Sequence, residues 1–264
     1  MSTYRPFFKL MTVGLLLIFS QTTLAAPLPS KTAVKKNRVI TRVIFRPPLS
    51  NKRPDRTTGA GTRDSRRCQK STPSTTGKNL PLMALVPMQQ SGGLTLSERP
   101  TFWVYLPENS AKQVVLNIQE QEETLQGDRS EPPLKPHSQT FFTINGASGL
   151  MGLTPSETSP PFKIGKTYKW AMVLVCEKVH PDNPVVTAWV QRVAPVGFLK
   201  PGPALAQASW YGEQGLWYDT LTALAQTKLA QTPDLPQVWD EFLKSGGLEP
   251  IPMDAARSYF VALP

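Results

Sequence analysis

The chain has 264 residues and a formal net charge of +10 at pH 7. That length allows one large domain, or one domain with appendages. Only two cysteines and two histidines are present, without clustered cysteines or a His-x-x-x-His pair, which argues against a dedicated zinc site. Residues 59–61 (GAG) fit neither a phosphate-binding loop nor a dinucleotide-binding fingerprint, so no cofactor is expected.

Residues 1–25 have the features of a secretory signal peptide. Arg5 and Lys9 form a short cationic start, and Leu10–Ser20 is an apolar run. Residues 23–25 (TLA) place small side chains where a signal peptidase cleaves, so we expect cleavage after residue 25. The apolar run is too short to cross a bilayer, which takes about 20 residues. The sequence therefore predicts an exported protein, periplasmic or secreted, with no transmembrane segment once the signal is removed.

Residues 26–56 are predicted to be a disordered, basic linker, because prolines punctuate a Lys/Arg-rich stretch with little to bury. Residues 26–78 hold 14 Lys/Arg and 2 Asp/Glu, whereas residues 79–264 hold 13 Lys/Arg and 17 Asp/Glu. A basic arm on an acidic body can bind an anionic surface or fold back on its own body. The candidate contacts to an anionic surface are Lys31, Lys35, Lys36, Arg38, Arg42, Arg46, Lys52 and Arg53.

Val39–Phe45 (VITRVIF) interrupts this arm with a β-prone run. Two interpretations stay open: it pairs as an edge strand on a partner, or it is a short apolar patch in a disordered arm. In an exported protein, the anionic surface would be lipid head groups, lipopolysaccharide or acidic wall polymer. Nucleic acid is a poor candidate in that compartment.

Residues 57–200 are predicted to form a β-sandwich domain that opens with irregular chain over residues 57–79. From Leu80 onward, short runs rich in Val, Phe, Trp, Tyr and Ile are separated by Pro, Gly and Asn. Seven short runs favour an antiparallel, immunoglobulin-like sandwich over a parallel α/β sheet. The predicted strands are Leu82–Val86, Thr101–Leu106, Gln113–Gln119, Thr140–Asn145, Gly149–Leu153, Thr167–Cys176 and Val185–Val193. Glu120–Ser138, which carries five acids and three prolines, is predicted to be an exposed loop.

Residues 201–250 are predicted to be a helical segment, followed by a C-terminal tail over residues 251–264. The expected helices are Ala204–Tyr211, Leu216–Ala230 and Gln237–Ser245. Residues 211–220 (YGEQGLWYDT) resemble the crossing of one tetratricopeptide-type helix pair. A single unit of that kind cannot bury its own apolar face, so we expect these helices to dock on the sandwich.

Cys68 and Cys176 are the only cysteines. In an oxidising compartment a disulfide between them is the expected state, and two free thiols are the alternative. The bridge would tie the end of the basic region to the middle of the folded body.

Several blocks of sequence match one known family. They are residues 59–63 (GAGTR) followed by Cys68, 93–107 (GLTLSERPTFWVYLP), 160–162 (PPF), 165–176 (GKTYKWAMVLVC), 189–195 (WVQRVAP) and 215–219 (GLWYD). In these blocks the chain resembles the cyanobacterial family catalogued as domain of unknown function 928, over about residues 57–250. The resemblance implies an exported cyanobacterial protein, and it brings neither an activity nor catalytic residues.

Paired carboxylates are the one catalytic design that the composition allows. The candidate members are Glu98, Glu177, Asp182 and Asp219. A glycoside hydrolase needs two carboxyl groups held about 5–10 Å apart, a separation that sequence does not show. Glu98-Arg99 equally suits a structural ion pair at the start of a strand. The acidic residues of Glu120–Ser138 lack the spacing of a calcium-binding loop, so no metal is expected there either.

Six tryptophans raise the possibility of a carbohydrate platform. Three lie in predicted strands (Trp103, Trp170 and Trp189) and three in or beside predicted helices (Trp210, Trp217 and Trp239). Tryptophan at such places belongs more often to the core than to a ligand platform.

Two functions from different classes follow. The first is a non-catalytic interaction module of the envelope or secreted fraction, whose basic arm binds anionic surfaces and whose partner is another exported protein or an anionic envelope polymer. The alternative is a carbohydrate- or peptidoglycan-active hydrolase that uses two carboxylates. A cleft in which two of the candidate acids face each other would favour the hydrolase.

Overall fold

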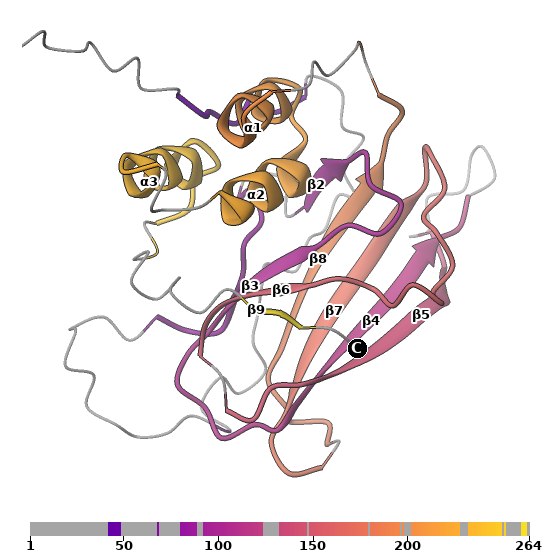
Figure 1. Ribbon diagram of the computed structural model, residues 1–264. Helices are drawn as coiled ribbons and strands as arrows, with labels where there is room; N and C mark the ends of the chain where they lie inside the picture. Colours follow the sequence, from indigo (N-terminus) through magenta and orange to yellow (C-terminus); the bar gives the residue numbers. More distant parts are fainter. Residues whose placement is uncertain are drawn as a thin grey trace, which may run out of the picture. The chain divides into compact units, whose positions relative to one another are not determined.

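Two β-sheets and three helices make up the part of the chain that the computed structural model describes (Figure 1). The described residues are 42–48, 68, 80–88, 92–123, 132–146, 148–178, 180–195, 197, 202–227, 232–249, 251 and 260–262. All of them belong to one unit, Ile40–Pro264. The expected signal peptide, most of the basic arm and most of the expected tail lie outside the described residues.

The larger sheet has five strands in the order β2-β8-β7-β4-β5. Their bounds are Gly92–Thr95 for β2, Val185–Arg192 for β8, Thr167–Val175 for β7, Gln113–Gln121 for β4 and Leu134–Thr143 for β5. From β8 to β5 each neighbouring pair is antiparallel, whereas β2 runs parallel to β8. The parallel pair is possible because a long stretch of chain separates β2 from β8 and can return to the same end of the sheet.

The smaller sheet has the order β1-β3-β6-β9. Its strands are β1 (Met83–Ala84), β3 (Phe102–Leu106), β6 (Gly149–Leu153) and β9 (Phe260–Ala262). β9 runs parallel to β6, and the other pairs are antiparallel. Both sheets are therefore mixed, and the prediction of purely antiparallel sheets is wrong at these two edges. The mostly β architecture with a C-terminal helical part is confirmed.

Alternating side chains build the core between the sheets. In β7, Tyr168, Trp170, Met172 and Leu174 are buried, while the residues between them are partly exposed. Successive side chains of a strand point to opposite faces, so this alternation presents one apolar face. Phe102 of β3 packs on Trp170 with 4.9 Å between ring centroids, which joins the two sheets.

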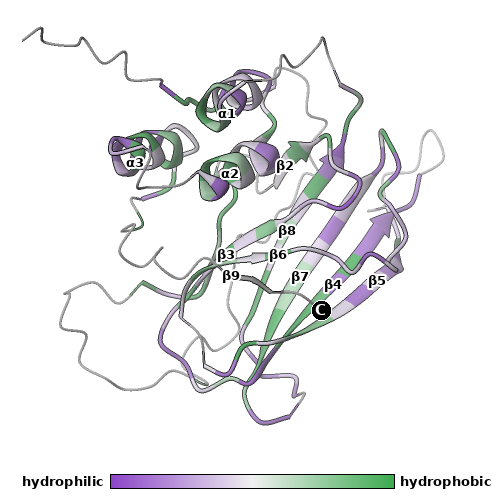
Figure 2. Ribbon diagram, viewed as in Figure 1, coloured by the Kyte–Doolittle hydropathy of each residue, from purple (hydrophilic) through white to green (hydrophobic). Residues whose placement is uncertain are grey.

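All seven predicted strands are present, but the predicted loop is too long. β4 continues to Gln121 and β5 already begins at Leu134, so both strands extend into Glu120–Ser138. β5 lies at the edge of its sheet, where solvent-facing polar residues are tolerated, as the hydrophilic colouring along much of it shows (Figure 2). The polar composition of residues 134–139 therefore hid the first part of β5 from the hydrophobic pattern.

The three predicted helices are confirmed with shifted ends: α1 (Ala204–Glu213), α2 (Trp217–Gln226) and α3 (Leu235–Ser245). α2 lies beside β2 (Figure 1), and buried hydrogen bonds join it to both sheets. The Trp170 indole N–H donates to the Tyr218 hydroxyl at 2.9 Å, and the Trp217 indole N–H donates to the Leu85 carbonyl at 2.8 Å. Among the described residues, no helix is both long and apolar enough to span a bilayer.

Candidate functional site

A polar pocket of about 250 Å³ lies between the segment that follows β2 and the helices α1 and α2. Ser97 and Arg99 line it from the strand side, and Gln207, Tyr211 and Asp219 line it from the helices. These two groups are more than a hundred residues apart in the chain, and the docking of α2 on β2 brings them together. A concave site with a few convergent polar groups is the usual form of a small-molecule site.

Asp219 is the acidic residue of this lining. It lies in the first turn of α2, where the helix dipole favours a carboxylate. Its Oδ2 accepts a hydrogen bond from the Leu96 N–H at 3.2 Å, and the Thr95 hydroxyl donates to the same carboxyl group. Burial outweighs these bonds and raises the pKa of Asp219 from 3.8 to about 6. The carboxyl group therefore changes charge in a mildly acidic range.

Arg99 is the cation of the pocket, and each of its two terminal nitrogens makes one hydrogen bond. Nη1 donates to Glu98 Oε1 at 2.7 Å, and Nη2 donates to the Ser159 carbonyl at 2.9 Å. The buried Nε has no hydrogen-bond partner among the described residues. The expected ion pair between Glu98 and Arg99 is thus present, and it neutralises the guanidinium locally.

Tyr211 and Gln226 add neutral polar groups to the same lining. Tyr211 is half-buried, and burial, followed by the charge of Asp219, raises the pKa of its phenol. Its hydroxyl is therefore protonated at neutral pH. Gln226 is exposed at the end of α2.

The four carboxylates proposed from sequence do not form a pair in either described pocket. Asp219 lines the first pocket, and Glu98 lines a second one. Glu177 and Asp182 are exposed in the connection between β7 and β8, where Asp182 Oδ2 lies 3.3 Å from His180 Nδ1. Among the described residues, neither pocket therefore holds the pair of candidate acids that the hydrolase alternative needs.

The second pocket, of about 510 Å³, is lined by two polar residues, Glu120 and His137, that were predicted to lie in an exposed loop and not in a site. Glu120 of β4 is only 6% exposed, and its Oε2 lies 3.9 Å from Nδ1 of His137 on β5. Burial lowers the pKa of His137, although Glu120 and the Pro160 carbonyl oppose that shift. Both residues belonged to the predicted exposed loop, and only the pairing of β4 with β5 buries them together.

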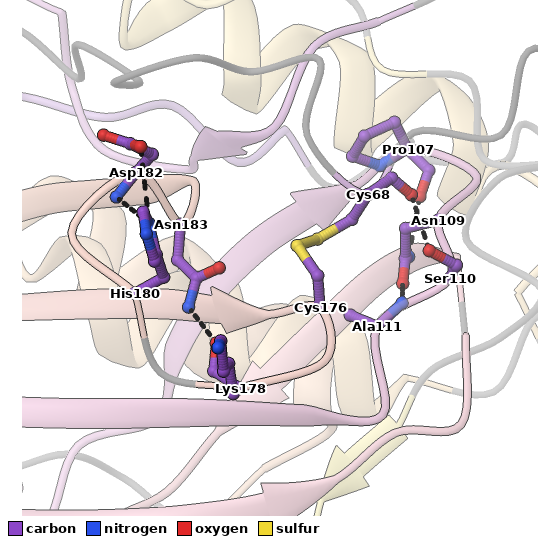
Figure 3. Close-up of a disulfide and its surroundings, with 10 residues drawn as sticks. All are labelled: Cys68, Pro107, Asn109, Ser110, Ala111, Cys176, Lys178, His180, Asp182 and Asn183. Carbon is purple, nitrogen blue, oxygen red and sulfur yellow. Dashed lines mark hydrogen bonds and ion pairs between the residues drawn. A yellow bond between two sulfur atoms is a disulfide. The ribbon is translucent and has the colours of Figure 1, made fainter.

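A disulfide joins Cys68 to Cys176, with 5.4 Å between their Cα atoms (Figure 3). The bridge lies at the end of β7, beside the turn that precedes β4. There the Ser110 N–H donates to the Cys68 carbonyl at 2.8 Å, and the Ala111 N–H donates to Asn109 Oδ1 at 3.0 Å. The cystine thus attaches a residue of the predicted irregular chain to the edge of the folded body.

Residues 42–48, which we name the anchor segment, pack against the helices. Val43 is fully buried and Phe45 is 4% exposed. The Phe45 ring meets the Trp217 ring edge-on, with 4.9 Å between centroids. The prediction of a disordered linker is therefore wrong for this part of residues 26–56, because its apolar side chains find a binding surface on the same chain.

Main-chain bonds hold the anchor segment on both α1 and α3. The Phe45 N–H donates to Ser245 Oγ at 2.8 Å, and the Arg46 N–H donates to the Gly212 carbonyl at 3.0 Å. Arg42 and Arg46, two of the proposed anionic-surface residues, are exposed here. Arg42 Nε lies 3.5 Å from Glu241 Oε2. The remaining proposed residues, Lys31, Lys35, Lys36, Arg38, Lys52 and Arg53, lie outside the described residues.

The tryptophans belong mainly to the core. Trp103, Trp170, Trp217 and Trp239 are buried, whereas Trp189 and Trp210 are half-buried. Within the described part of the chain, no group of three or more His, Cys, Asp or Glu residues could hold a metal ion. Within the described residues, we therefore take the polar pocket as the candidate site.

A comparison with protein families matches residues 58–255 to the model described as Domain of Unknown Function (DUF928). The match covers most of the chain, from before Cys68 to beyond α3. No curated protein matches the chain. Two of the blocks that carry the resemblance, residues 93–107 and 215–219, meet at the polar pocket.

Proposed function

The chain belongs to the DUF928 family, and we propose that it is a non-catalytic interaction module of the cell envelope or secreted fraction. The β-sheets and docked helices form the rigid body, and the basic arm is an electrostatic tether to an anionic surface. The anchor segment is the observation that carries this proposal. It fixes residues 42–48 of the arm to the helices and leaves the side chains of Arg42 and Arg46 exposed.

The charge distribution supports the same role. Residues 26–78 hold 14 Lys/Arg and 2 Asp/Glu, while the rest of the predicted mature chain has an acidic excess. Each Lys or Arg near an anionic membrane contributes about 1 kcal/mol of attraction. Since the anchor segment is held by buried apolar contacts rather than by its charges, the cations upstream of it are not needed for docking. They can instead contact a surface.

The test uses co-sedimentation of the predicted mature chain, residues 26–264, with phosphatidylglycerol-phosphatidylcholine vesicles. A variant with Lys35, Lys36 and Arg38 changed to Ser should bind about a hundredfold more weakly, because three charges are lost at about 1 kcal/mol each. The matched control changes Lys112, Lys178 and Lys244 of the body to Ser, which removes the same charge and should leave binding nearly unchanged.

A second measurement varies the salt concentration. Raising the salt from about 0.1 M to about 1 M shortens the Debye length from about 10 Å to about 3 Å and should release the protein. Binding that survives high salt, or that falls equally in both triple variants, would contradict the tether.

Export, a cyanobacterial source, an immunoglobulin-like topology and a tetratricopeptide-like crossing stay predictions from the sequence. The tether requires only a basic arm next to an anchored segment. The hydrolase alternative also stays a prediction, and it is not developed further because neither described pocket is lined by two of its four candidate carboxylates.

A further inference from the structure

We propose that the polar pocket between the β2–β3 connection and helices α1 and α2 binds a neutral sugar ring. The groups that converge there include a carboxyl group, a guanidinium, phenols, amides and hydroxyls. Among the residues that carry them are Asp219, Arg99, Tyr211, Gln207, Gln226 and Ser97. Sugar hydroxyls both donate and accept hydrogen bonds, so they match a lining that mixes donors with acceptors.

The charge of the pocket argues for a neutral ligand. The positive charge of Arg99 is already balanced by the Glu98 carboxylate at 2.7 Å, so an anionic ligand would have to compete with that ion pair. Its Nε, which has no partner among the described residues, can still donate to a neutral hydroxyl group. Asp219 already accepts bonds from Leu96 and Thr95, which reduces its need for a cationic partner. A carboxyl group in this position can still accept a bond from a hydroxyl group through a remaining lone pair.

The hydrogen-bonding capacity on the helical side is still open. Among the described residues, neither the Tyr211 hydroxyl nor the Gln226 amide makes a side-chain hydrogen bond, although both residues line the pocket. Gln207, by contrast, donates to the Gly202 carbonyl at 2.8 Å and retains its amide oxygen as an acceptor. A ligand that satisfies these groups replaces water there and breaks no hydrogen bond within the protein.

The size of the pocket restricts the ligand further. Drug-sized ligands occupy pockets of roughly 300–1,000 Å³, and this pocket has about 250 Å³. It therefore suits one ring rather than an oligosaccharide. The half-buried Tyr211 supplies an aromatic surface of the kind that packs against the C–H groups of a sugar.

The test is saturation-transfer-difference NMR on the purified full chain at pH 7, with D-glucose, N-acetyl-D-glucosamine and D-glucosamine as probes. The first two are neutral and the third carries an ammonium group. We expect weak binding of a neutral sugar, in the millimolar range. Asp219→Asn and Gln226→Ala should each weaken it, the former by about tenfold, because a hydrogen bond to a charged group is lost. Glu213→Gln, an exposed acid-to-amide change on α1 outside the pocket lining, should bind as the original chain does.

Each outcome decides the proposal. Transfer to a neutral sugar that falls in both pocket variants and persists in Glu213→Gln supports it. No transfer to any of the three sugars overturns it, as does equal binding by all variants. Tighter binding of D-glucosamine than of D-glucose also overturns it, in favour of a cation site. Gln226 is exposed, so Gln226→Ala gives an answer even if Asp219→Asn fails to fold. Vesicle binding by the basic arm is a separate measurement, so either proposal can fail without the other.

Discussion

Tyr218 and Asp219 are neighbours in the chain, but Tyr218 makes buried structural contacts and Asp219 lines the pocket. The Tyr218 hydroxyl is buried, accepts the Trp170 indole N–H and donates to the Trp189 carbonyl at 2.8 Å. Consecutive residues of a helix with 3.6 residues per turn point in directions about 100° apart. The same helical turn therefore fastens α2 to the larger sheet with one side chain and presents a carboxyl group to the pocket with the next.

The raised pKa of Asp219 predicts that this residue lowers the stability of the folded protein in a pH-dependent way. In the folded chain its pKa is about 6, against 3.8 ordinarily, so between these values the folded state keeps a proton that the unfolded state releases. The free energy of unfolding consequently falls as the pH rises through this window, and the loss is complete above pH 6. Asparagine does not titrate. The free energy of unfolding of Asp219→Asn, compared with that of the original chain, should therefore rise by about 1–3 kcal/mol from about pH 4 to about pH 7.

Urea unfolding at several pH values measures this gain as a difference between variant and original chain, which cancels the other titrating groups. Glu213→Gln is the control, since no comparable burial surrounds that exposed residue. Parallel stability curves for Asp219→Asn and the original chain would show that Asp219 titrates normally.

At the scale of single residues, the sequence could nominate Asp219 but could not select it. It was one of four candidate acids, and the property that distinguishes it is its position against Leu96 and Thr95. Those contacts join residues more than a hundred positions apart, which no local pattern encodes. Glu120 and His137 were assigned to solvent for the same reason.

Among the elements, the anchor segment depends on a helical glycine. Gly212 lies in α1, and a Cβ built there would lie 2.6 Å from the Ile44 carbonyl oxygen. The backbone of the segment can approach α1 this closely only because the side chain is absent. The Arg46 N–H then reaches the Gly212 carbonyl at 3.0 Å, and Phe45 reaches Trp217.

We therefore predict that Gly212→Ala destabilises the protein. In an isolated helix this change would stabilise by about 1 kcal/mol. Here the added methyl group meets the main chain of the anchor segment, so we expect a net loss of about 1–3 kcal/mol and faster amide exchange in residues 42–48. Urea unfolding and hydrogen-exchange mass spectrometry give the two readouts.

In a chain that begins at Leu49, the anchor segment is missing and the sign should reverse, because only the helix propensity remains. A stabilising effect of Gly212→Ala in the full chain would show that the segment does not dock as described.

β2, the strand near the pocket, was not predicted, and its composition differs from that of the predicted strands. Thr167–Val175 alternates large apolar with smaller or polar residues, and its pattern is visible without any tertiary information. β2 (GGLT) carries two glycines, which normally disfavour strands. A Cβ at Gly93 would lie 2.7 Å from the Trp217 Cβ, so this glycine is needed for the contact between β2 and α2. The requirement comes from a helix more than a hundred residues away.

At the scale of the whole molecule, three sets of contacts join parts of the chain that are distant in sequence. The anchor segment joins residues near 45 to the helices, β2 joins residues near 94 to β8, and the disulfide joins Cys68 to Cys176 across 108 residues. The layers and the helical segment could be predicted because each follows a local period. These long-range contacts could not be predicted in the same way. Only the cystine among them had a signal in the sequence, namely a single pair of cysteines in an expected oxidising compartment.

The disulfide should stabilise the protein chiefly by restricting the unfolded chain. For a loop of about 100 residues the chain-entropy estimate is about 4–5 kcal/mol, which is a large part of the roughly 5–15 kcal/mol by which domains are stable. Urea unfolding with and without reductant should therefore show a marked loss of stability in the original chain. The double variant Cys68→Ser with Cys176→Ser should start at the lower stability and be insensitive to reductant. If the oxidised chain and the double variant unfold at the same urea concentration, the bridge contributes nothing, and the bonds around Ser110 and Asn109 hold this edge of the fold without it.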